Sequence, residues 1–380
     1  MNTSSLKSLF IAASCGLAFA AQADAQVWDA SRPTPLSSEL AGQISREVQR
    51  AMAEFDLKQL DALQSAEALK QLRELAALNE LDAHALRPLL LDSEDAVGGG
   101  HNNDRDGGDA AGPVIDEHRP LNAEGRIYIN NTAGNIDVST WDRNEVVITG
   151  TLGGSAERLD INGDPAALNV VVRLPKHSFH AGETILKLRV PSNARVDLDT
   201  VSADVAVDGA RGAVKVNTVS GDIGLVVNSP EVTVQTVSGD LRLRAPAKLT
   251  KVNSVSGDLR MAGLQGKLSV ETVSGNVELD GGKFSELRLK SISGDLRLDV
   301  AFADAAEVVG ETLSGEINMR VPSGLTGTAL LKSFSGETRC DGASFENARS
   351  SRKREYVWGD GKGARIELSS FSGDIHVERK

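Results

Sequence analysis

The sequence is poor in aromatic residues and in cysteine, and it has no long apolar run beyond its first residues. Aromatic side chains make up 4% of the 380 residues, which argues against a sugar-binding platform, because such sites are lined by aromatic rings. No stretch approaches the about 20 apolar residues that a membrane-spanning helix needs. The CxxC pair of redox proteins, the phosphate-binding loop and the Ser/His/Asp order of hydrolases are also missing.

The first 25 residues are predicted to be an export signal. Lys7 supplies a positive start, residues 9–21 are apolar but short, and Ala23-Asp24-Ala25 is a typical cleavage site. Lipidation at Cys15 is the alternative, but Cys15 lacks the leucine usually found three places upstream. Cleavage after Ala25 leaves Cys340 as the single cysteine, so no internal disulfide can form. The expected location is therefore outside the cytoplasm, either in the periplasm or at the cell surface.

The charge balance argues against a nucleic-acid partner. The chain has 41 Lys and Arg residues against 53 Asp and Glu residues, and its net charge is −12. Phosphate contacts require a basic face. We therefore expect an envelope protein or a surface polymer as the partner.

Residues 26–91 are predicted to be helical. Leu40, Ile44 and Val48 begin an apolar stripe at helical spacing, and similar spacing continues beyond Leu60. The segment fits one or two amphipathic helices packed on the rest of the protein. Its length also fits a coiled-coil or partner-binding arm, including self-association through residues 38–91.

Residues 92–113 have the composition of a flexible Gly/Asp-rich linker. Asn102, Asp104 and Asp106 match the first ligand positions of an EF-hand calcium loop. The twelfth position should be a glutamate and is Pro113, so the bidentate ligand is missing.

From residue 114 to residue 380 the chain is β-rich and carries a repeat. Ser-Gly-Asp or a near copy recurs about every 18 residues, and Ser202-Ala203-Asp204 precedes the series. The repeat glycines are Gly221, Gly239, Gly257, Gly275, Gly294, Gly315, Gly336 and Gly373. A fixed period of this size predicts an all-β fold, a parallel β-solenoid of about 18-residue coils, preceded by the N-terminal helical segment.

Aligning the coils on their glycines predicts which side chains face inward. Apolar residues recur two and four places after the glycine, as Ile223 and Leu225 do, and also two places before it, as Val219 does. We expect all three columns to lie in the core. Steps of three and four residues between inward positions predict turns, and hence about three short sides per coil. The Thr and Ser columns are expected to form a flat outer face, as follows: Thr218, Thr236, Ser254, Thr272 and Ser291 with Ser220, Ser238, Ser256 and Ser274.

The acidic residue after each glycine would form a column of like charges. Turn chemistry explains it best, because the glycine allows a positive φ and the carboxylate accepts turn amide protons. Outward arginines such as Arg242 and Arg260 can balance the charge. A divalent cation is the weaker alternative, and its candidate ligands are Asp222, Asp240, Asp258 and Asp295. No cofactor is expected.

We expect no enzymatic activity. Some β-helices cleave acidic polysaccharides, but such sites need carboxylates that converge in a groove departing from the repeat. Here the carboxylates are the repeat itself. His177 and His180 have metal-pair spacing for a helix, but they lie between predicted strands.

The region from about Val114 to the end resembles the bacterial "putative adhesin" family of domains of unknown function. The matching elements are residues 134–142, residues 188–198, the Thr-Val-Ser-Gly-Asp repeats at 218–222 and 236–240, and the ending at 370–375. The resemblance implies an exported β-solenoid with no catalytic residues. Similar domains also occur in envelope-stress signalling.

These observations favour a non-enzymatic cell-envelope protein that acts as a scaffold, an envelope-stress-related partner or a binding module. A surface adhesin is the first alternative, and a polysaccharide-acting β-helix enzyme is the second.

Overall fold

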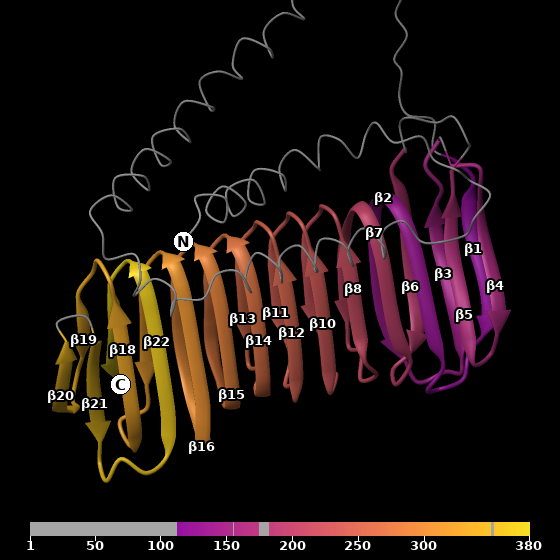
Figure 1. Ribbon diagram of the computed structural model, residues 1–380. Helices are drawn as coiled ribbons and strands as arrows, with labels where there is room; N and C mark the ends of the chain where they lie inside the picture. Colours follow the sequence, from indigo (N-terminus) through magenta and orange to yellow (C-terminus); the bar gives the residue numbers. More distant parts are fainter. Residues whose placement is uncertain (1–111, 155, 175–181, 351–352) are drawn as a thin grey trace, which may run out of the picture. The chain divides into compact units, whose positions relative to one another are not determined.

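The computed structural model describes residues 112–380 except 155, 175–181 and 351–352. The signal, the helical segment and the linker up to residue 111, together with Cys15, His177 and His180, lie outside the described residues. The boundaries at residues 25, 91 and 113 stay predictions. The described part is all β, and it forms the solenoid-like stack of strands seen in Figure 1.

Seven strands build the amino-terminal part of the stack. They are β1 (Val114–Pro120), β2 (Arg126–Trp141), β3 (Glu145–Thr151), β4 (Arg158–Asp164), β5 (Ala167–Arg173), β6 (Thr184–Pro191) and β7 (Arg195–Asp208). The regular repeat follows as β8 (Val214–Thr218), β9 (Ile223–Val226), β10 (Glu231–Thr236), β11 (Leu241–Arg244), β12 (Leu249–Ser254), β13 (Leu259–Ala262), β14 (Gln265–Ser274), β15 (Val277–Ser293), β16 (Leu296–Ser314) and β17 (Ile317–Val321). The carboxyl-terminal part contains β18 (Gly327–Ser333), β19 (Thr338–Cys340), β20 (Ser344–Ser350), β21 (Lys353–Trp358), β22 (Ala364–Ser372) and β23 (Ile375–Arg379).

Successive coils pair in parallel with the predicted register. Val216 pairs with Leu198 in the coil before and with Val234 in the coil after, a step of 18 residues each way. The same step continues from Val234 to Val252 and on to Val270. The expected parallel solenoid of 18-residue coils is therefore confirmed for this region.

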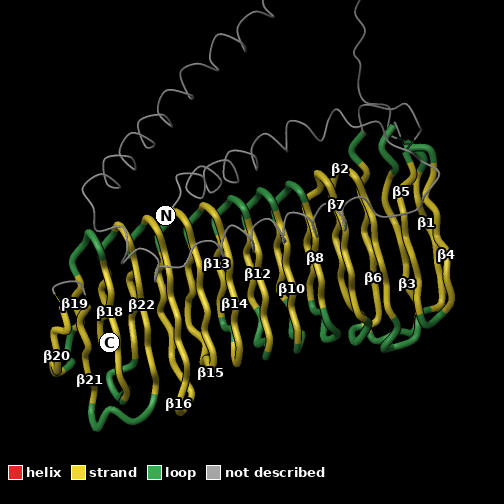
Figure 2. The backbone as a smooth tube through the Cα atoms, in the orientation of Figure 1, coloured by secondary structure: helices red, strands yellow, loops and turns green. Residues whose placement is uncertain are grey.

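The coils have the third side that the spacing predicted, but from β8 to β13 only two of the three sides are strands. The first strand, such as β8, and the second, such as β9, meet at the Ser-Gly-Asp corner. In the coil of β8 and β9 the third stretch, residues 227–230, is not a strand, although the amide of Val227 donates to Arg244 O at 3.0 Å. Further along the stack β15 and β16 continue through this stretch, where Phe284 pairs with Gly266 and Phe302. Figure 2 shows these turns along both edges of the stack.

The last coil of the chain is not the last coil of the stack. β22 pairs with β16 on one side and with β18 on the other, and β23 lies in the same way between β17 and β19. The chain therefore places β18 and β19 one coil beyond the position next to β16 and β17, and β22 and β23 then occupy that position. Nothing in the repeat pattern predicted this order.

The amino-terminal part contains a matching exchange. β2 pairs in parallel with β5 and β6 on one side and with β7 on the other. The first long strand, β2, thus lies between strands that all follow it in sequence. Antiparallel strands complete both ends, because β1, β3 and β4 join the first coils and the β20–β21 hairpin joins β18.

The core lies inside the coils, where both strands and the third stretch line it, and Ala245, Ala247 and Leu264 of the third stretch are at most 1% exposed. Alternate side chains point inward because the side-chain period of a strand is two. Val214 and Val216 in β8 and Ile223 and Leu225 in β9 are all at most 1% exposed. The same positions are buried in successive coils, so each core column is a line of stacked aliphatic side chains.

Candidate functional site: the Ser-Gly-Asp corner

The repeat glycines lie where the chain turns from the first strand of a coil to the second. Seven of the eight have the predicted positive φ: Gly221 (112°), Gly239 (116°), Gly257 (113°), Gly275 (113°), Gly294 (128°), Gly315 (138°) and Gly373 (151°). A Cβ added at Gly239 would lie 2.2 Å from the carbonyl oxygen of Gly221 in the preceding coil. Close stacking of the corners therefore requires glycine. Gly336, in the coil at the carboxyl-terminal end of the stack, lacks the positive φ.

The acidic column forms a hydrogen-bonded ladder. The amide of Asp240 donates to Oδ1 of Asp222 at 3.0 Å, and the amide of Asp258 donates to Oδ1 of Asp240 at 3.0 Å. The ladder includes the side chains of Asp204, Asp258, Asn276, Asp295 and Asp374, each of which accepts from the next coil at 2.7–3.1 Å. One oxygen of each of these aspartates is therefore committed to joining coils. The turn interpretation predicted that the carboxylate accepts a turn amide proton, and here that amide belongs to the corner of the neighbouring coil.

The other carboxylate oxygen of the metal candidates faces arginine. Oδ2 of Asp258 lies 3.0 Å from Arg260, and Oδ2 of Asp295 lies 3.2 Å from Arg297. Asp222 and Asp240 have longer ion pairs of 3.7–3.8 Å with Arg242, and Arg260 also approaches Asp240 at 3.7 Å. Among the described residues, no three His, Cys, Asp or Glu side chains gather as metal ligands would. The four candidates are strung along the stack, one per coil.

The first Thr and Ser column is buried, which corrects the expected outer face. Thr218, Thr236 and Ser254 are at most 3% exposed, and so are Thr272 and Ser291. The hydroxyl of Thr236 donates to Ser238 O at 3.1 Å, and four other coils repeat this bond. The second column, Ser220, Ser238, Ser256 and Ser274, is half-buried, and each hydroxyl lies 3.3–3.4 Å from a carbonyl oxygen of the preceding coil. These hydroxyls tie the corner together.

The apolar column two places before the glycine faces outward, which corrects its expected place in the core. Val214, Val216 and Thr218 are the inward positions of β8, and Val219, which follows the end of the strand on the opposite side of the chain, is half-buried and absent from the core cluster. We call this column the corner ridge. In spatial order it is Val201, Val219, Val237, Val255, Val273, Ile292, Leu313, Phe371 and Phe334. Eight of the nine are half-buried and Val237, at 9% exposed, is buried, but none of the nine belongs to the main cluster of packed core side chains.

Two aromatic rings end the ridge. The ring centroids of Phe371 and Phe334 lie 4.8 Å apart, and the planes differ by 6°. This stacking requires the inserted coil, because Phe371 reaches the ridge through β22, between Leu313 and Phe334. The sequence had one signal for the outward ridge, namely the unbroken alternation from Val214 to Thr218.

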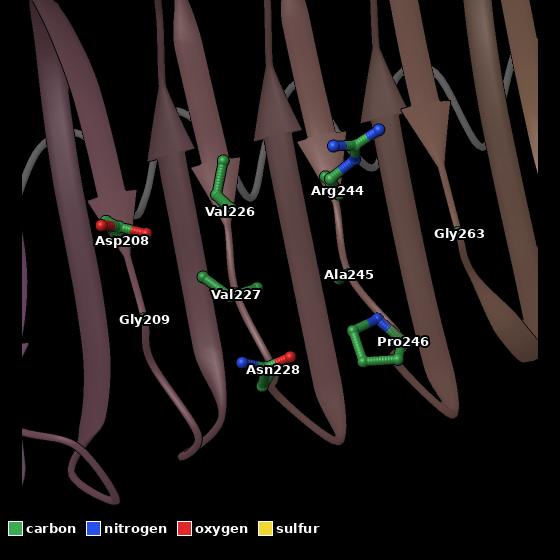
Figure 3. A pocket seen from close by; sticks show the side chains of 9 residues that line it. All are labelled: Asp208, Gly209, Val226, Val227, Asn228, Arg244, Ala245, Pro246 and Gly263. Carbon is green, nitrogen blue, oxygen red and sulfur yellow. The ribbon is translucent and has the colours of Figure 1, made fainter.

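A second surface feature lies where the second strands end. A hollow of about 240 Å³ is lined by Asp208, Gly209, Val226, Val227, Asn228, Arg244, Ala245, Pro246 and Gly263 (Figure 3). Val226 is 54% exposed. Small residues, including Gly209 and Gly263, leave this space open. Asp208 and Arg244 are its charged side chains, two coils apart, and they do not converge as catalytic groups would.

Two titratable groups on the described domain are shifted by burial. Burial raises the pKa of Cys340 to about 12, and the charge of Asp341 adds to the effect. Cys340 is half-buried beside the core, in the column where it was expected. Burial also raises the pKa of Tyr128, whose hydroxyl donates to Asp199 at 2.8 Å. Both groups therefore stay protonated, and a neutral Cys340 thiol is a poor nucleophile.

Comparisons with solved structures find low similarity over most of the described domain. A "putative adhesin" from Bacteroides fragilis is 11% identical, covers 70% of this chain and 97% of its own, and has a TM-score of 0.28. A "putative adhesin" from Parabacteroides distasonis is 14% identical, covers 71% of this chain and 98% of its own, and also has a TM-score of 0.28. No curated protein matches the sequence.

In the part of the chain that the structure describes, no helix is long and apolar enough to cross a membrane.

The described domain also matches the model of a known family. The model of the family described as Toastrack DUF4097 matches two overlapping stretches, residues 119–261 and 247–378. Together they span the stack from β2 to β23, including every repeat glycine. The chain belongs to the Toastrack DUF4097 family.

Proposed function

We propose that this chain is an exported, non-enzymatic module of the cell envelope that acts by binding a partner along its corner ridge. One observation carries the proposal. The ridge is a line of apolar side chains outside the main core cluster that recurs in nine coils, and eight of the nine keep part of their surface in solvent. Contiguous apolar surface marks interaction sites on soluble proteins. A scaffold or an envelope-stress-related partner would use such a surface in the same way.

The chemistry of the corner supports binding over catalysis. Six of the eight carboxylates of the acidic column accept from an amide of the neighbouring coil, and arginines approach five of the eight. The hydroxyls donate to carbonyl groups. A polysaccharide-acting enzyme remains the opposing hypothesis. An acidic residue whose replacement abolished hydrolysis while the fold stayed intact would establish it.

The first test concerns location. Ser323 is exposed in the turn between β17 and β18, so Ser323→Cys in a Cys340→Ala background offers one reactive thiol. A membrane-impermeant maleimide should label it only after the outer membrane is opened if the module is periplasmic. Labelling of intact cells would favour the adhesin alternative. Labelling only in lysed cells would contradict export.

The second test concerns the contact surface. A photo-crosslinking amino acid at Val219 or Val255 places the probe on the ridge, and the same amino acid at Val226 places it on an exposed apolar site elsewhere. We expect a discrete crosslinked species in intact cells from the two ridge positions and none from Val226. Equal crosslinking from all three, or none from any, would contradict the proposal.

A further inference from the structure

We infer that the corner ridge binds an amphipathic helix whose apolar stripe is bordered by Lys and Arg. This inference rests on the proposed function and specifies the chemistry of the partner. It follows from the backbone at the corner, the charge beside it, and the spacing of its side chains.

The backbone at the ridge has no hydrogen-bonding capacity to offer an added strand. Val219 O accepts from the amide of Ser238 at 2.9 Å, and Val237 O accepts from the amide of Ser256 at 2.8 Å. The serine hydroxyls approach the same carbonyl oxygens at 3.3–3.4 Å. Recognition by strand addition requires unpaired backbone groups. A partner must therefore bind the ridge through side chains.

The charge beside the ridge is negative. The acidic ladder lies across the glycine from the ridge, and eight of its nine positions are carboxylates: Asp204, Asp222, Asp240, Asp258, Asp295, Glu316, Asp374 and Glu337. Arginines approach five of them at 3.0–3.8 Å. Asp204, Glu316 and Asp374 have no ion pair within the described domain. Cationic side chains would complement this column.

The charge also argues against two other occupants of the ridge. A second copy placed antiparallel on the ridge would bring two acidic ladders together, and each chain already carries a net charge of −12. An anionic lipid surface attracts basic segments and would be repelled by the ladder. A cationic partner meets neither difficulty.

The spacing favours a helix over an extended peptide. Coils lie about 4.8 Å apart, so the nine ridge side chains extend over roughly 38 Å. Core positions of a heptad repeat recur on average every 3.5 residues, which at 1.5 Å per residue is about 5.2 Å. Same-face side chains of an extended chain are about 6.7 Å apart. Over four or five coils, the core side chains of a helix therefore stay nearly aligned with successive ridge side chains, whereas the side chains of an extended peptide do not.

The test uses the full-length exported protein and a fluorescent 18-residue peptide of leucine and lysine in a heptad pattern. The control peptide has glutamate in place of lysine. Fluorescence anisotropy should show binding of the lysine peptide and at least tenfold weaker binding of the glutamate peptide. The triple variant Val219→Thr, Val255→Thr, Val273→Thr should weaken binding of the lysine peptide at least tenfold. The matched control Val226→Thr should change it less than twofold.

The variants separate ridge recognition from general attraction to an acidic protein. All of them keep the net charge, so equal binding to wild type and to the triple variant would overturn the inference. Thermal unfolding of each variant shows whether the stack is intact. If the lysine peptide fails to bind while Val255 still crosslinks in cells, the partner chemistry is wrong but the proposed function stands. If both fail, the proposed function fails as well.

Discussion

The backbone amide of Glu337 donates a 2.7 Å hydrogen bond to the carboxylate of Asp374, which follows it by 37 residues. Elsewhere in the ladder the carboxylate belongs to the earlier coil, as in the bond from Asp240 N to Asp222 Oδ1. The reversal at Asp374 shows that the final coil of the chain, β22 and β23, is stacked between two coils that precede it in sequence. The carboxyl-terminal strands are therefore interior elements of the stack.

Removing residues 363–380 should destabilise the protein far more than loss of an end coil would. The deletion exposes the edges of β16 and β18 at once and removes the buried side chains Ile366, Leu368, Ile375 and Val377. We expect the truncated protein to unfold at a lower urea concentration, and a synthetic 363–380 peptide to restore the midpoint. A peptide carrying Ile375→Asp should not restore it. An unchanged urea midpoint after truncation would contradict the inserted order.

Gly239→Ala should cost at least about 3 kcal/mol of unfolding free energy, because φ is 116° and the new Cβ would lie 2.2 Å from Gly221 O. Gly263→Ala is the matched control. Its φ is 69° and no atom lies within 4 Å of the added Cβ, so the cost should be about 1 kcal/mol. Urea unfolding of both variants measures the difference. Similar costs would show that corner packing is looser than described.

Two buried threonines should respond in opposite ways to replacement by valine. Thr236 donates to Ser238 O at 3.1 Å, so Thr236→Val should destabilise the protein by about 1–2 kcal/mol. Thr250 is fully buried, and its hydroxyl has no hydrogen-bond partner within the described domain. Thr250→Val should therefore be neutral or stabilising by up to about 1 kcal/mol. Thermal unfolding distinguishes the two, and destabilisation by Thr250→Val would reveal a missing partner.

Acid should weaken the fold partly through Glu286 and Asp160. Hydrogen bonds from Arg288 and Lys267 lower the pKa of Glu286, and those from Arg158 and Arg173 lower the pKa of Asp160. A lowered folded-state pKa gives stability that is present above the unfolded-state pKa and is lost as pH falls through the folded-state pKa. The unfolding free energy of wild type should therefore decline below about pH 4.5. The double variant Glu286→Gln, Asp160→Asn should show a shallower decline, and parallel curves would contradict the assignment.

The sequence predicted the coils because their register follows directly from the 18-residue period. It placed Val219 inside and Thr218 outside because valine is apolar and threonine is polar. The strand geometry decides otherwise, since Thr218 continues the inward alternation of Val214 and Val216 and finds a carbonyl partner in the turn. Local periodicity was the better guide to orientation than residue type.

The insertion of the last coil could not be predicted in this way. Neighbouring coils present similar residues in each column. Ile317 could therefore pair with Thr338 of the next coil in sequence or with Ile375 of the last coil, and in the structure it pairs with Ile375. The pattern specifies the contents of a coil but not which coil is its neighbour. The corner ridge follows from the same repetition, and the alternation within β8 indicates its place outside the core.

The exchange of coils at both ends limits how a protein of this kind can change in length. An open solenoid can gain a coil at either end, because its terminal coil offers an edge to the next. Here the first long strand and the final coil are each held between two others. A duplicated coil can be accommodated only in the regular middle, between β8 and β16. Gene duplication would therefore lengthen the array, and the ridge with it, from within.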